Sequence, residues 1–195
     1  EMIRALPLEN QVVGILRTIN DRLADAVYCD ELRVLWGRDY YNEEILGLKF
    51  KVSAFSFFQT NVDAVERLYS YAVSLIEDFE NKEIFDLYSG TGTIAQILAP
   101  VAKEVIGVEI VEEAVEAAKV NAGLNGLDNC RFLAGDVFEV LDSLPDKPEV
   151  IVVDPPRVGI SSNALEKIIG YGVKQIVYIS CNPKTQARDL AYLTA

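Results

Sequence analysis

The sequence contains no histidine among its 195 residues. Histidine is the side chain that most often moves protons near neutral pH, and it is the commonest metal ligand. Its absence excludes histidine-based acid–base chemistry and most metal sites, so we expect no metal in this chain. Cysteine is scarce as well, because Cys29, Cys130 and Cys181 are too few and too scattered for a disulfide framework or a zinc site. We expect Cys29 and Cys130 to lie in the core.

Long apolar runs and an excess of basic residues are also missing. No stretch of 18 apolar residues occurs, and residues 1–10 lack the basic start of a signal peptide. We therefore expect a soluble, cytoplasmic protein that does not associate with membranes. Lysine and arginine total 18 against 30 aspartates and glutamates, which gives a net charge of −12. This balance argues against a nucleic-acid-binding surface, which usually needs a basic footprint.

The chain does contain a glycine turn between an apolar run and a helical pattern, at residues 84–95. The apolar run ends at Asp86, Gly90 and Gly92 follow, and the helical pattern begins at Thr93. Glycine lets the backbone approach a ligand closely, and the free N–H groups at a helix start face the same place. The spacing Gly-x-Gly-x-x-Ala alone is also compatible with a loose dinucleotide fingerprint or with an ordinary strand-to-helix turn.

Strand and helix patterns alternate from residue 84 to the end of the chain. This alternation predicts an α/β fold, with a doubly wound, mostly parallel, Rossmann-like sheet and helices on both faces. We expect strands at 84–86, 104–108, 130–134, 150–153 and 175–179, and helices at 93–99, 111–124, 137–144, 162–169 and 183–193. The helix at 111–124 is expected to bury Val111, Val115, Ala118 and Ala122.

Residues 1–52 show short strand patterns and no helical period. The expected strands are 11–18, 26–30, 32–36 and 45–52. We interpret residues 1–52 as a β-rich subdomain or connector and residues 53–195 as the main domain.

An aromatic segment with amides at its end joins these two parts. Phe55, Phe57 and Phe58 are expected in the core, whereas the amide of Gln59 could orient a cofactor. Thr60 or Asn61 is expected to cap a helix that continues to about residue 78.

Four of the five expected strands of the parallel sheet end in an acid: Asp86, Glu109, Asp136 and Asp154. Ligands bind at the carboxyl edge of such sheets. Glu109 could accept both hydroxyls of a ribose, or it could be a surface acid that opens a helix. Asp136 could receive an adenine amino group, cap a helix, or do both. These acids favour a neutral ribose or a cationic cofactor over a polyphosphate.

Two segments that contain proline follow the last two strands, at 154–157 and 180–183. In the first, consecutive prolines stiffen the backbone next to Asp154. In the second, Pro183 is expected as the first helical residue and Asn182 as its cap. Cys181 then lies at a helix start, where the dipole favours a thiolate, and we expect it to be a nucleophile.

Four segments together resemble the RNA 5-methyluridine methyltransferases: Phe-Gln-Thr-Asn at 58–61, Asp-Leu-Tyr-Ser-Gly-Thr-Gly at 86–92, Asp-Pro-Pro-Arg at 154–157 and Ser-Cys-Asn-Pro at 180–183. The resemblance covers roughly residue 33 to the C-terminus. It implies methylation of uracil carbon 5 in RNA, with 23S rRNA favoured over tRNA, through a covalent adduct on Cys181.

The same resemblance implies S-adenosylmethionine as the cofactor and assigns residues to it. Cys181 and Asp154 are the implied catalytic residues. The residues implied to bind the cofactor are Gln59, Tyr88, Gly90, Gly92, Thr93, Glu109, Asp136 and Asp154.

The sequence also departs from this family. Members usually begin with an RNA-binding β-barrel, many carry a four-cysteine iron–sulfur segment, and they continue to a glutamate that acts as base. We find none of these here and interpret the chain as an internal fragment, incomplete at its C-terminal end and inactive in turnover by itself. The missing parts could carry the basic surface that RNA binding needs.

Two other interpretations stay open. A nicotinamide-dependent oxidoreductase could use the same glycine turn, but it would leave Cys181 and the two prolines after Asp154 unexplained. A non-catalytic cofactor- or RNA-binding module would be consistent with the acidic charge and with the missing base.

Overall fold

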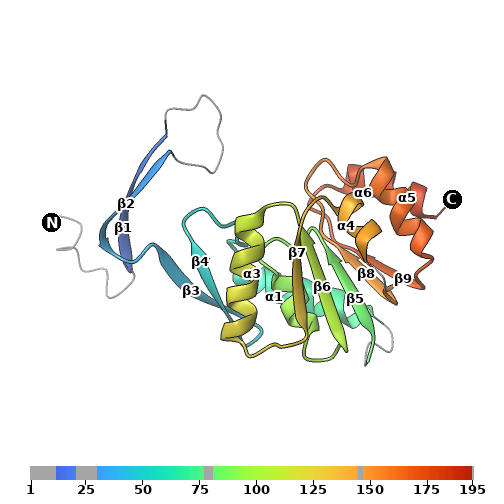
Figure 1. The fold of residues 1–195 in the computed structure, drawn as a ribbon, viewed down its shortest axis with the longest axis horizontal. Coiled ribbons are helices and arrows are strands. Elements are labelled where there is room, and N and C mark those ends of the chain that lie inside the picture. Colours follow the sequence, from blue (N-terminus) through green and yellow to red (C-terminus); the bar gives the residue numbers. More distant parts are fainter. Residues whose placement is uncertain (1–11, 21–29, 77–80, 145–146, 195) are drawn as a thin grey trace.

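The computed structural model describes residues 12–20, 30–76, 81–144 and 147–194. It contains a five-stranded parallel sheet flanked by helices and, on the N-terminal side, two antiparallel hairpins (Figure 1). The strands of the sheet are β5 (Glu83–Leu87), β6 (Glu104–Glu109), β7 (Cys130–Ala134), β8 (Val150–Val153) and β9 (Gln175–Tyr178). The predicted α/β fold with a doubly wound parallel sheet is confirmed.

The strand order of the sheet is β7-β6-β5-β8-β9. The chain moves outward from β5 through β6 to β7 and then returns to the other side of β5 to form β8 and β9. Because the direction of winding reverses at β5, this strand marks the switch point where open α/β sheets bind their ligands.

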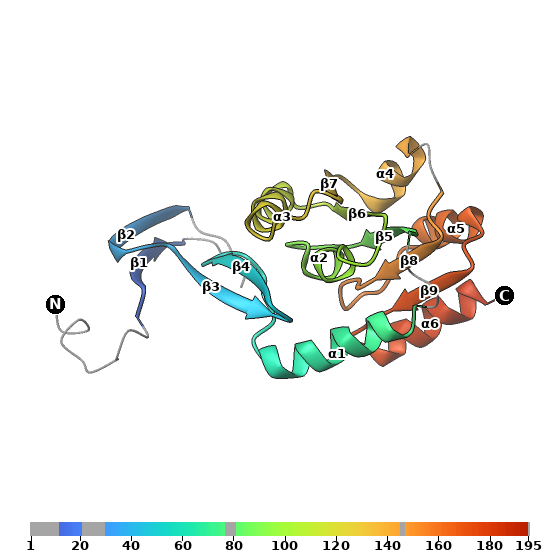
Figure 2. The same cartoon turned by 90° about the horizontal axis from the view of Figure 1, so that it is seen from below.

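Helices cover both faces of the sheet (Figure 2). One buried cluster joins the sheet to α1 (Val62–Ser74), α2 (Thr93–Leu98) and α3 (Glu112–Leu124). A second cluster joins the other face to α4 (Val137–Ser143) and α5 (Ser162–Tyr171), with Leu193 of α6 (Pro183–Leu193) packed against it. Strands that are buried on both faces explain the near-continuous apolar runs in the sequence.

Two helices differ in detail from the sequence prediction, α3 in one residue of its buried face and α1 in where it ends. In α3, Val115, Ala118 and Ala122 are buried as predicted, but Val111 is 49% exposed. Val111 is the N-cap of α3, so it lies outside the helical repeat that faces the core.

In α1, the buried stripe runs through Val65, Tyr69 and Ala72, while Leu68 and Leu75 are each 44% exposed. The helix ends at Ser74, earlier than the predicted end near 78, and residues 77–80 lie outside the described part. Asn61 caps α1 by accepting a hydrogen bond from the backbone N–H of Ala64.

The N-terminal part consists of two hairpins. β1 (Gly14–Ile19) pairs with β2 (Glu31–Gly37), and β3 (Tyr40–Ile45) pairs with β4 (Leu48–Ser53). The single strand predicted at 45–52 is wrong, because the chain reverses at Leu46 and Gly47, whose φ values are 50° and 80°. Of the strand predicted at 26–30, only residue 30 belongs to the described part of the chain. Cys29 lies outside that part, so its expected place in the core stays a prediction.

The hairpin of β3 and β4 packs into the main core. Ile45, Phe50 and Val52 are buried in the same cluster as α1, α2 and α3. The predicted division of the chain at residue 52 stays a prediction.

Of the aromatic residues expected in the core, Phe58 packs against Phe50 with ring centroids 5.8 Å apart, but Phe57 is 78% exposed. The prediction for Phe57 is therefore wrong.

Two asparagines of α3 and the loop after it bind the free edge of β4. Asn121 Oδ1 accepts a hydrogen bond from Lys51 N at 2.9 Å. Asn125 Oδ1 accepts one from Lys49 N at 2.8 Å, and its Nδ2 donates to Lys49 O at 2.9 Å. These side chains replace a neighbouring strand, so they satisfy backbone groups that would otherwise lose water without compensation.

We predict that Asn121→Ala lowers the free energy of unfolding by about 1–3 kcal/mol, because it leaves the N–H of Lys51 without its acceptor in a partly buried place. Urea denaturation measures this change. Asn163→Ala on the exposed side of α5 is the matched control and should change stability by less than about 0.5 kcal/mol. Equal effects of the two substitutions would contradict the role given to Asn121.

Candidate active site

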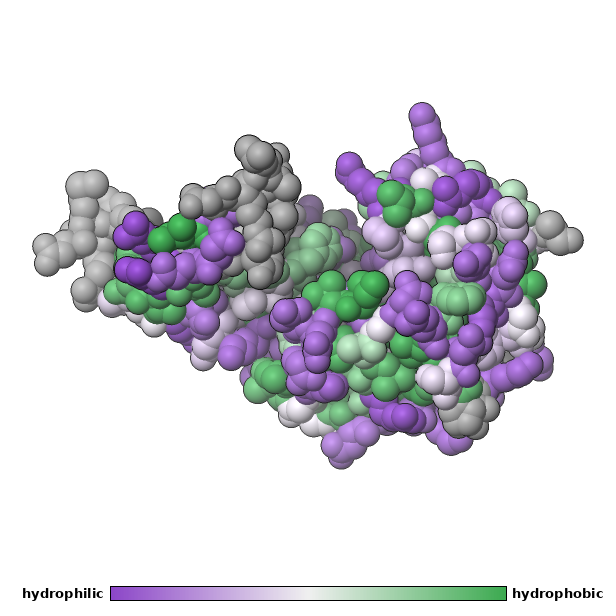
Figure 3. Space-filling model, turned by 45° about the horizontal axis from the view of Figure 1, so that its top comes forward, coloured by the Kyte–Doolittle hydropathy of each residue, from purple (hydrophilic) through white to green (hydrophobic). Residues whose placement is uncertain are grey.

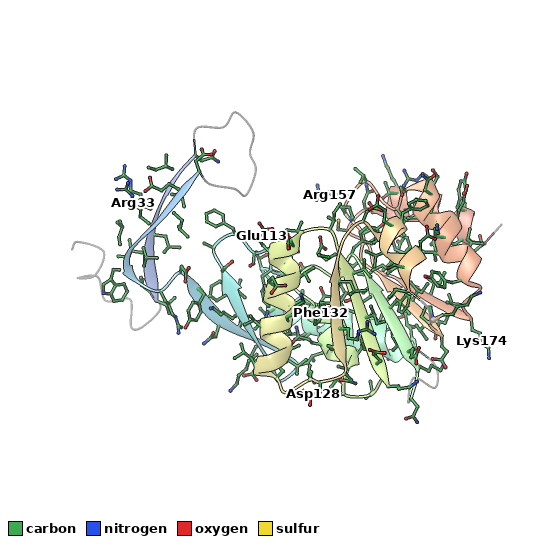
Figure 4. All side chains as sticks on the ribbon, in the orientation of Figure 1. Arg33, Glu113, Asp128, Phe132, Arg157 and Lys174 are labelled. Atoms are coloured by element: carbon green, nitrogen blue, oxygen red, sulfur yellow. The ribbon has the colours of Figure 1, made fainter. Side chains whose placement is uncertain are left out.

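The predicted site residues gather at the carboxyl edge of the sheet. Glu109 ends β6, Asp136 and Asp154 follow β7 and β8, and Cys181 follows β9. In Figure 4 this edge is marked by Arg157 and Glu113, while Asp128 and Lys174 mark the opposite edge. The prediction that these polar residues share one edge is confirmed.

The same edge, tilted toward the viewer in Figure 3, shows hydrophilic residues with small groups of apolar ones between them.

Asp86 occupies a different place from the one predicted. β5 continues through Leu87, so Asp86 does not end the strand, and its side chain is fully buried. Asp86 Oδ2 accepts a hydrogen bond from Ala95 N of α2 at 2.9 Å, while Oδ1 has no hydrogen-bond partner. Burial, together with the nearby charges of Asp154 and Glu109, raises the pKa of Asp86 to about 8, although the hydrogen bond from Ala95 N acts in the opposite direction. Asp86 thus supports the glycine turn from beneath.

Three residues of the glycine turn adopt the left-handed backbone conformation. Tyr88, Gly90 and Gly92 have φ values of 65°, 54° and 75°. A Cβ at position 92 would lie 2.6 Å from the ring of Phe132, so close packing requires glycine there. At position 90 a Cβ would meet nothing within 4 Å. Gly92 therefore allows tight packing, and Gly90 leaves open space above the turn.

Tyr88 is a non-glycine residue in the left-handed region, a conformation that costs roughly 1–2 kcal/mol. Strain of this size is concentrated at functional sites, where surrounding structure holds it in place. The side chain is half-buried, and burial raises its pKa to about 12.

Glu109 is anchored against this turn. Its Oε2 accepts a hydrogen bond from Gly90 N at 3.0 Å, and its Oε1 accepts one from Val111 N at 2.9 Å. Each oxygen keeps a lone pair for a further donor, so the half-buried carboxylate can still accept two hydroxyl groups. Glu109 lies before the first turn of α3, whose acids are Glu112 and Glu113, and its role in binding a ribose stays a prediction.

Asp136 and Thr93 lie at the starts of α4 and α2. Asp136 Oδ1 accepts a hydrogen bond from Phe138 N at 2.8 Å, which confirms its predicted role as N-cap. Asp136 remains exposed, and a role in binding adenine stays a prediction. Thr93 is the first residue of α2 and is half-buried.

Three polar side chains, Asp154, Tyr69 and Gln59, lie near one another on the β8 side of β5. They come from the loop after β8, from α1 and from the segment before α1. Asp154 is half-buried, and burial raises its pKa to about 6. Tyr69 of α1 hydrogen-bonds the side chain of Gln59 and interacts with the charges of Asp154 and Asp86, and burial raises its pKa to about 12. The sequence interpretation missed Tyr69. Its helical spacing from Val65 could have placed its hydroxyl on the buried stripe.

Cys181 lies exposed in the segment between β9 and α6. Pro183 is the first residue of α6 and Asn182 is its N-cap, as predicted. Asn182 Nδ2 and Thr185 Oγ1 both donate to Arg157 O, at 2.9 and 3.2 Å. The two proline-containing segments are therefore joined, which brings the region of Asp154 beside that of Cys181.

Cys130 differs from Cys181 in its surroundings. It is half-buried, its Sγ donates to Ala95 O at 3.6 Å, and burial raises its pKa to about 12. A thiol with such a pKa is a weak nucleophile near neutral pH.

Among the described residues, no group of three His, Cys, Asp or Glu side chains is arranged to hold a metal ion. No helix in that part of the chain is long and apolar enough to cross a membrane.

The edge offers hydrogen-bond acceptors and partly desolvated carboxyl groups near one another. It is therefore suited to a ligand that donates hydrogen bonds through hydroxyl groups and carries a positive charge. The open space over Gly90 and the exposed thiol of Cys181 lie at this same edge.

Comparison with known proteins agrees with this geometry. Residues 78–193 match the family described as a methyltransferase domain. A Clostridium tetani protein named as an uncharacterized RNA methyltransferase is 53% identical over 193 residues, which cover 99% of this chain and 42% of that protein. A similarly named protein of Caldanaerobacter subterraneus is 54% identical over 190 residues, covering 97% of this chain and 42% of its own length. The chain thus spans less than half the length of these relatives.

A solved structure is similar over most of the chain. It is the tRNA (uracil-54, C5)-methyltransferase of Pyrococcus abyssi in complex with S-adenosyl-L-homocysteine, with a TM-score of 0.81 and 32% identity. The similarity covers 92% of this chain and 44% of that protein. Since the family match extends over more than half of the residues, from before β5 to the end of α6, the chain belongs to the methyltransferase domain family.

Proposed function

We propose that this chain is part of an S-adenosylmethionine-dependent enzyme that methylates uracil carbon 5 in RNA through a covalent adduct on Cys181, with 23S rRNA favoured over tRNA. The observation that carries the proposal is the exposed Cys181 beside the Asp154 segment, joined to it through the carbonyl of Arg157. The naming of the relatives as RNA methyltransferases and of the Pyrococcus abyssi enzyme as a uracil-C5 methyltransferase supports it.

The cofactor half of the site lies around the glycine turn. S-Adenosylmethionine supplies a methyl group on a positively charged sulfur. Glu109 accepts the ribose hydroxyls, the space over Gly90 admits the nucleoside, and Asp136 receives the adenine amino group. Tyr88, Gly92 and Thr93 shape this half, while Gln59 and Asp154 hold the charged end of the cofactor. The charge of Asp154 contributes to the raised pKa of the buried Asp86, and a cationic ligand near Asp154 would relieve that repulsion.

The reaction half depends on Cys181. Its thiolate adds to carbon 6 of the uracil, and the electrons of the carbon 5–carbon 6 double bond pass to the carbonyl oxygen as an enolate. Carbon 5 of the enolate would then take the methyl group as the carbonyl forms again, while the bond between the methyl carbon and sulfur breaks and its electrons stay on sulfur, which leaves as a neutral thioether. A base removes the remaining proton from carbon 5, the double bond forms again, and the thiolate leaves carbon 6. We assign no residue of this chain as that base.

The remaining sequence expectations belong to this proposal. The division into residues 1–52 and 53–195, the lack of turnover by this chain alone and the cytoplasmic location are parts of it. The family match favours a methyltransferase over a nicotinamide-dependent oxidoreductase. A non-catalytic module is an outcome of the test that follows.

The proposal predicts that the full-length protein converts uridine to 5-methyluridine in unmodified rRNA or tRNA, with the methyl group coming from labelled S-adenosylmethionine. Nucleoside mass spectrometry identifies the product. Cys181→Ser should abolish methylation, because a hydroxyl does not add to carbon 6 as a thiolate does. Cys130→Ser is the matched control and should stay active. Activity that survives Cys181→Ser would overturn the covalent mechanism, and S-adenosylmethionine binding without any methylated RNA would favour the non-catalytic module.

A second prediction concerns the ribose. Glu109→Ala should weaken S-adenosylmethionine binding by about 1–3 kcal/mol, because it removes acceptors for two hydroxyl groups. Isothermal calorimetry measures the dissociation constant. Glu113→Ala, on the same edge at the start of α3, should change the binding free energy by less than about 0.5 kcal/mol. Unchanged affinity after Glu109→Ala would refute the assignment.

A third prediction concerns pH. The pKa of Asp154 is raised to about 6, so the group is mostly protonated below that pH and ionised above it. An ionised Asp154 attracts a cationic ligand, so affinity for S-adenosylmethionine should rise between about pH 5 and pH 7. Calorimetry across this range should show the rise in the unmodified protein and a flatter profile in Asp154→Asn. Asp128→Asn at the opposite edge should leave the profile unchanged, and an equally steep profile in Asp154→Asn would disprove the assignment.

A further inference from the structure

Asp189 of α6 is a fully buried acid that no step of the proposed reaction uses. Its Oδ2 accepts hydrogen bonds from Ile160 N at 2.8 Å and from the hydroxyl of Tyr178 at 2.7 Å. Its Oδ1 accepts one from Arg188 Nε at 2.8 Å. Both oxygens are thus satisfied, by the loop after β8, by the end of β9 and by α6 itself.

Arg188 extends this network to the same loop. Its Nη2 donates to Val158 O at 3.0 Å and to Ile160 O at 3.4 Å. Gly159, between these two residues, has a φ of 80°, and a Cβ there would lie 2.5 Å from both Asp189 Oδ2 and Arg188 Nη2. The loop therefore lies directly on the charged pair, and only glycine permits that approach.

We call Tyr178, Arg188 and Asp189 the Asp189 clamp. Together with Asn182 and Thr185, which hold Arg157 O, the clamp binds the backbone groups of residues 157–160 to the N-terminal part of α6. The loop begins at Asp154, and α6 follows Cys181. The clamp consequently connects the loop after Asp154 to the segment that carries Cys181.

The sheet alone does not determine this arrangement. Among the described strands, β9 pairs only with β8, so the segment after β9 is held by the sheet on one side. Asp189 is the buried member of its ion pair, whereas the side chain of Arg188 is 56% exposed. A buried acid whose oxygens are all bonded to neighbouring segments fixes the geometry of those segments. Here the segments are the loop after β8 and α6.

We propose that Asp189 is a positioning residue, which holds Cys181 beside the loop after β8 in the arrangement that adduct formation requires. The inference rests on the proposed function. A nucleophile displaced by about 1 Å can lose roughly 10²-fold in rate. Loss of the clamp should therefore slow attack by Cys181 while the cofactor half, held by β5, β6 and α2, still binds its ligand.

The test uses the full-length protein with S-adenosylmethionine and RNA that carries 5-fluorouridine. Fluorine at carbon 5 cannot leave as a proton, so the thioether between Cys181 and carbon 6 persists and can be counted on a denaturing gel. We expect Asp189→Asn to slow adduct formation roughly 10²-fold, with the dissociation constant of S-adenosylmethionine changed less than about twofold. Asp142→Asn, an acid in a surface ion pair with Lys167, is the matched control and should behave like the unmodified protein.

Two milder variants cover the possibility that Asp189→Asn does not fold. Tyr178→Phe removes one hydrogen-bond donor to Asp189. Arg188→Lys keeps the positive charge but loses the guanidinium nitrogen Nη2 that donates to the loop after β8. Each should slow adduct formation by roughly tenfold, again with cofactor affinity unchanged. An unaltered adduct rate in these variants, or a parallel loss of cofactor affinity, melting temperature and adduct rate, would overturn the positioning role. If the unmodified protein binds S-adenosylmethionine but forms neither adduct nor 5-methyluridine, the proposed function fails and this inference fails with it.

Discussion

The hydrogen bond from Ala95 N to the buried carboxyl group of Asp86 is the contact on which the site depends. It ties the centre of the sheet to the first turn of α2 and so determines where the glycine turn lies. The cost is a fully desolvated acid whose pKa rises to about 8. With the turn held from beneath, its left-handed residues can leave the space over Gly90 open.

Glu109 completes that support from the side, since it accepts the N–H of Gly90. One half of the candidate site is therefore preorganised by carboxyl groups that bind backbone N–H groups of a rigid turn. The same groups make the edge acidic and partly dehydrated. Such an environment attracts a positively charged cofactor, and it is consistent with a chain whose net charge is −12.

The other half is organised differently. Cys181 and Asp154 follow the last two described strands of the sheet, and side chains of α6 hold their segments together. Here the geometry comes from hydrogen bonds between loop backbone and helix side chains. This difference is why we expect changes in α6 to affect the reaction more than the binding of the cofactor.

The sequence by itself determined the local features. Strand and helix alternation predicted the parallel sheet, and the caps Asn61, Asp136 and Asn182 were identifiable because a cap bonds to residues only two or three positions away. The acids at strand ends could be assigned to one edge, since parallel strands all end there. The turn at Leu46 and Gly47 was the local signal that the interpretation missed.

Only the tertiary structure decided which side chains meet. The packing of α1 on the sheet brings Tyr69 within the electrostatic influence of Asp154, and Asp189 reaches Ile160 across 29 positions of sequence. The exposure of Val111 and Phe57 was likewise decided by packing. Periodicity tells which face of an element is buried, but it carries no information about the element that covers that face. The partners of a buried polar group are therefore determined by the fold, and the groups themselves are determined by the sequence.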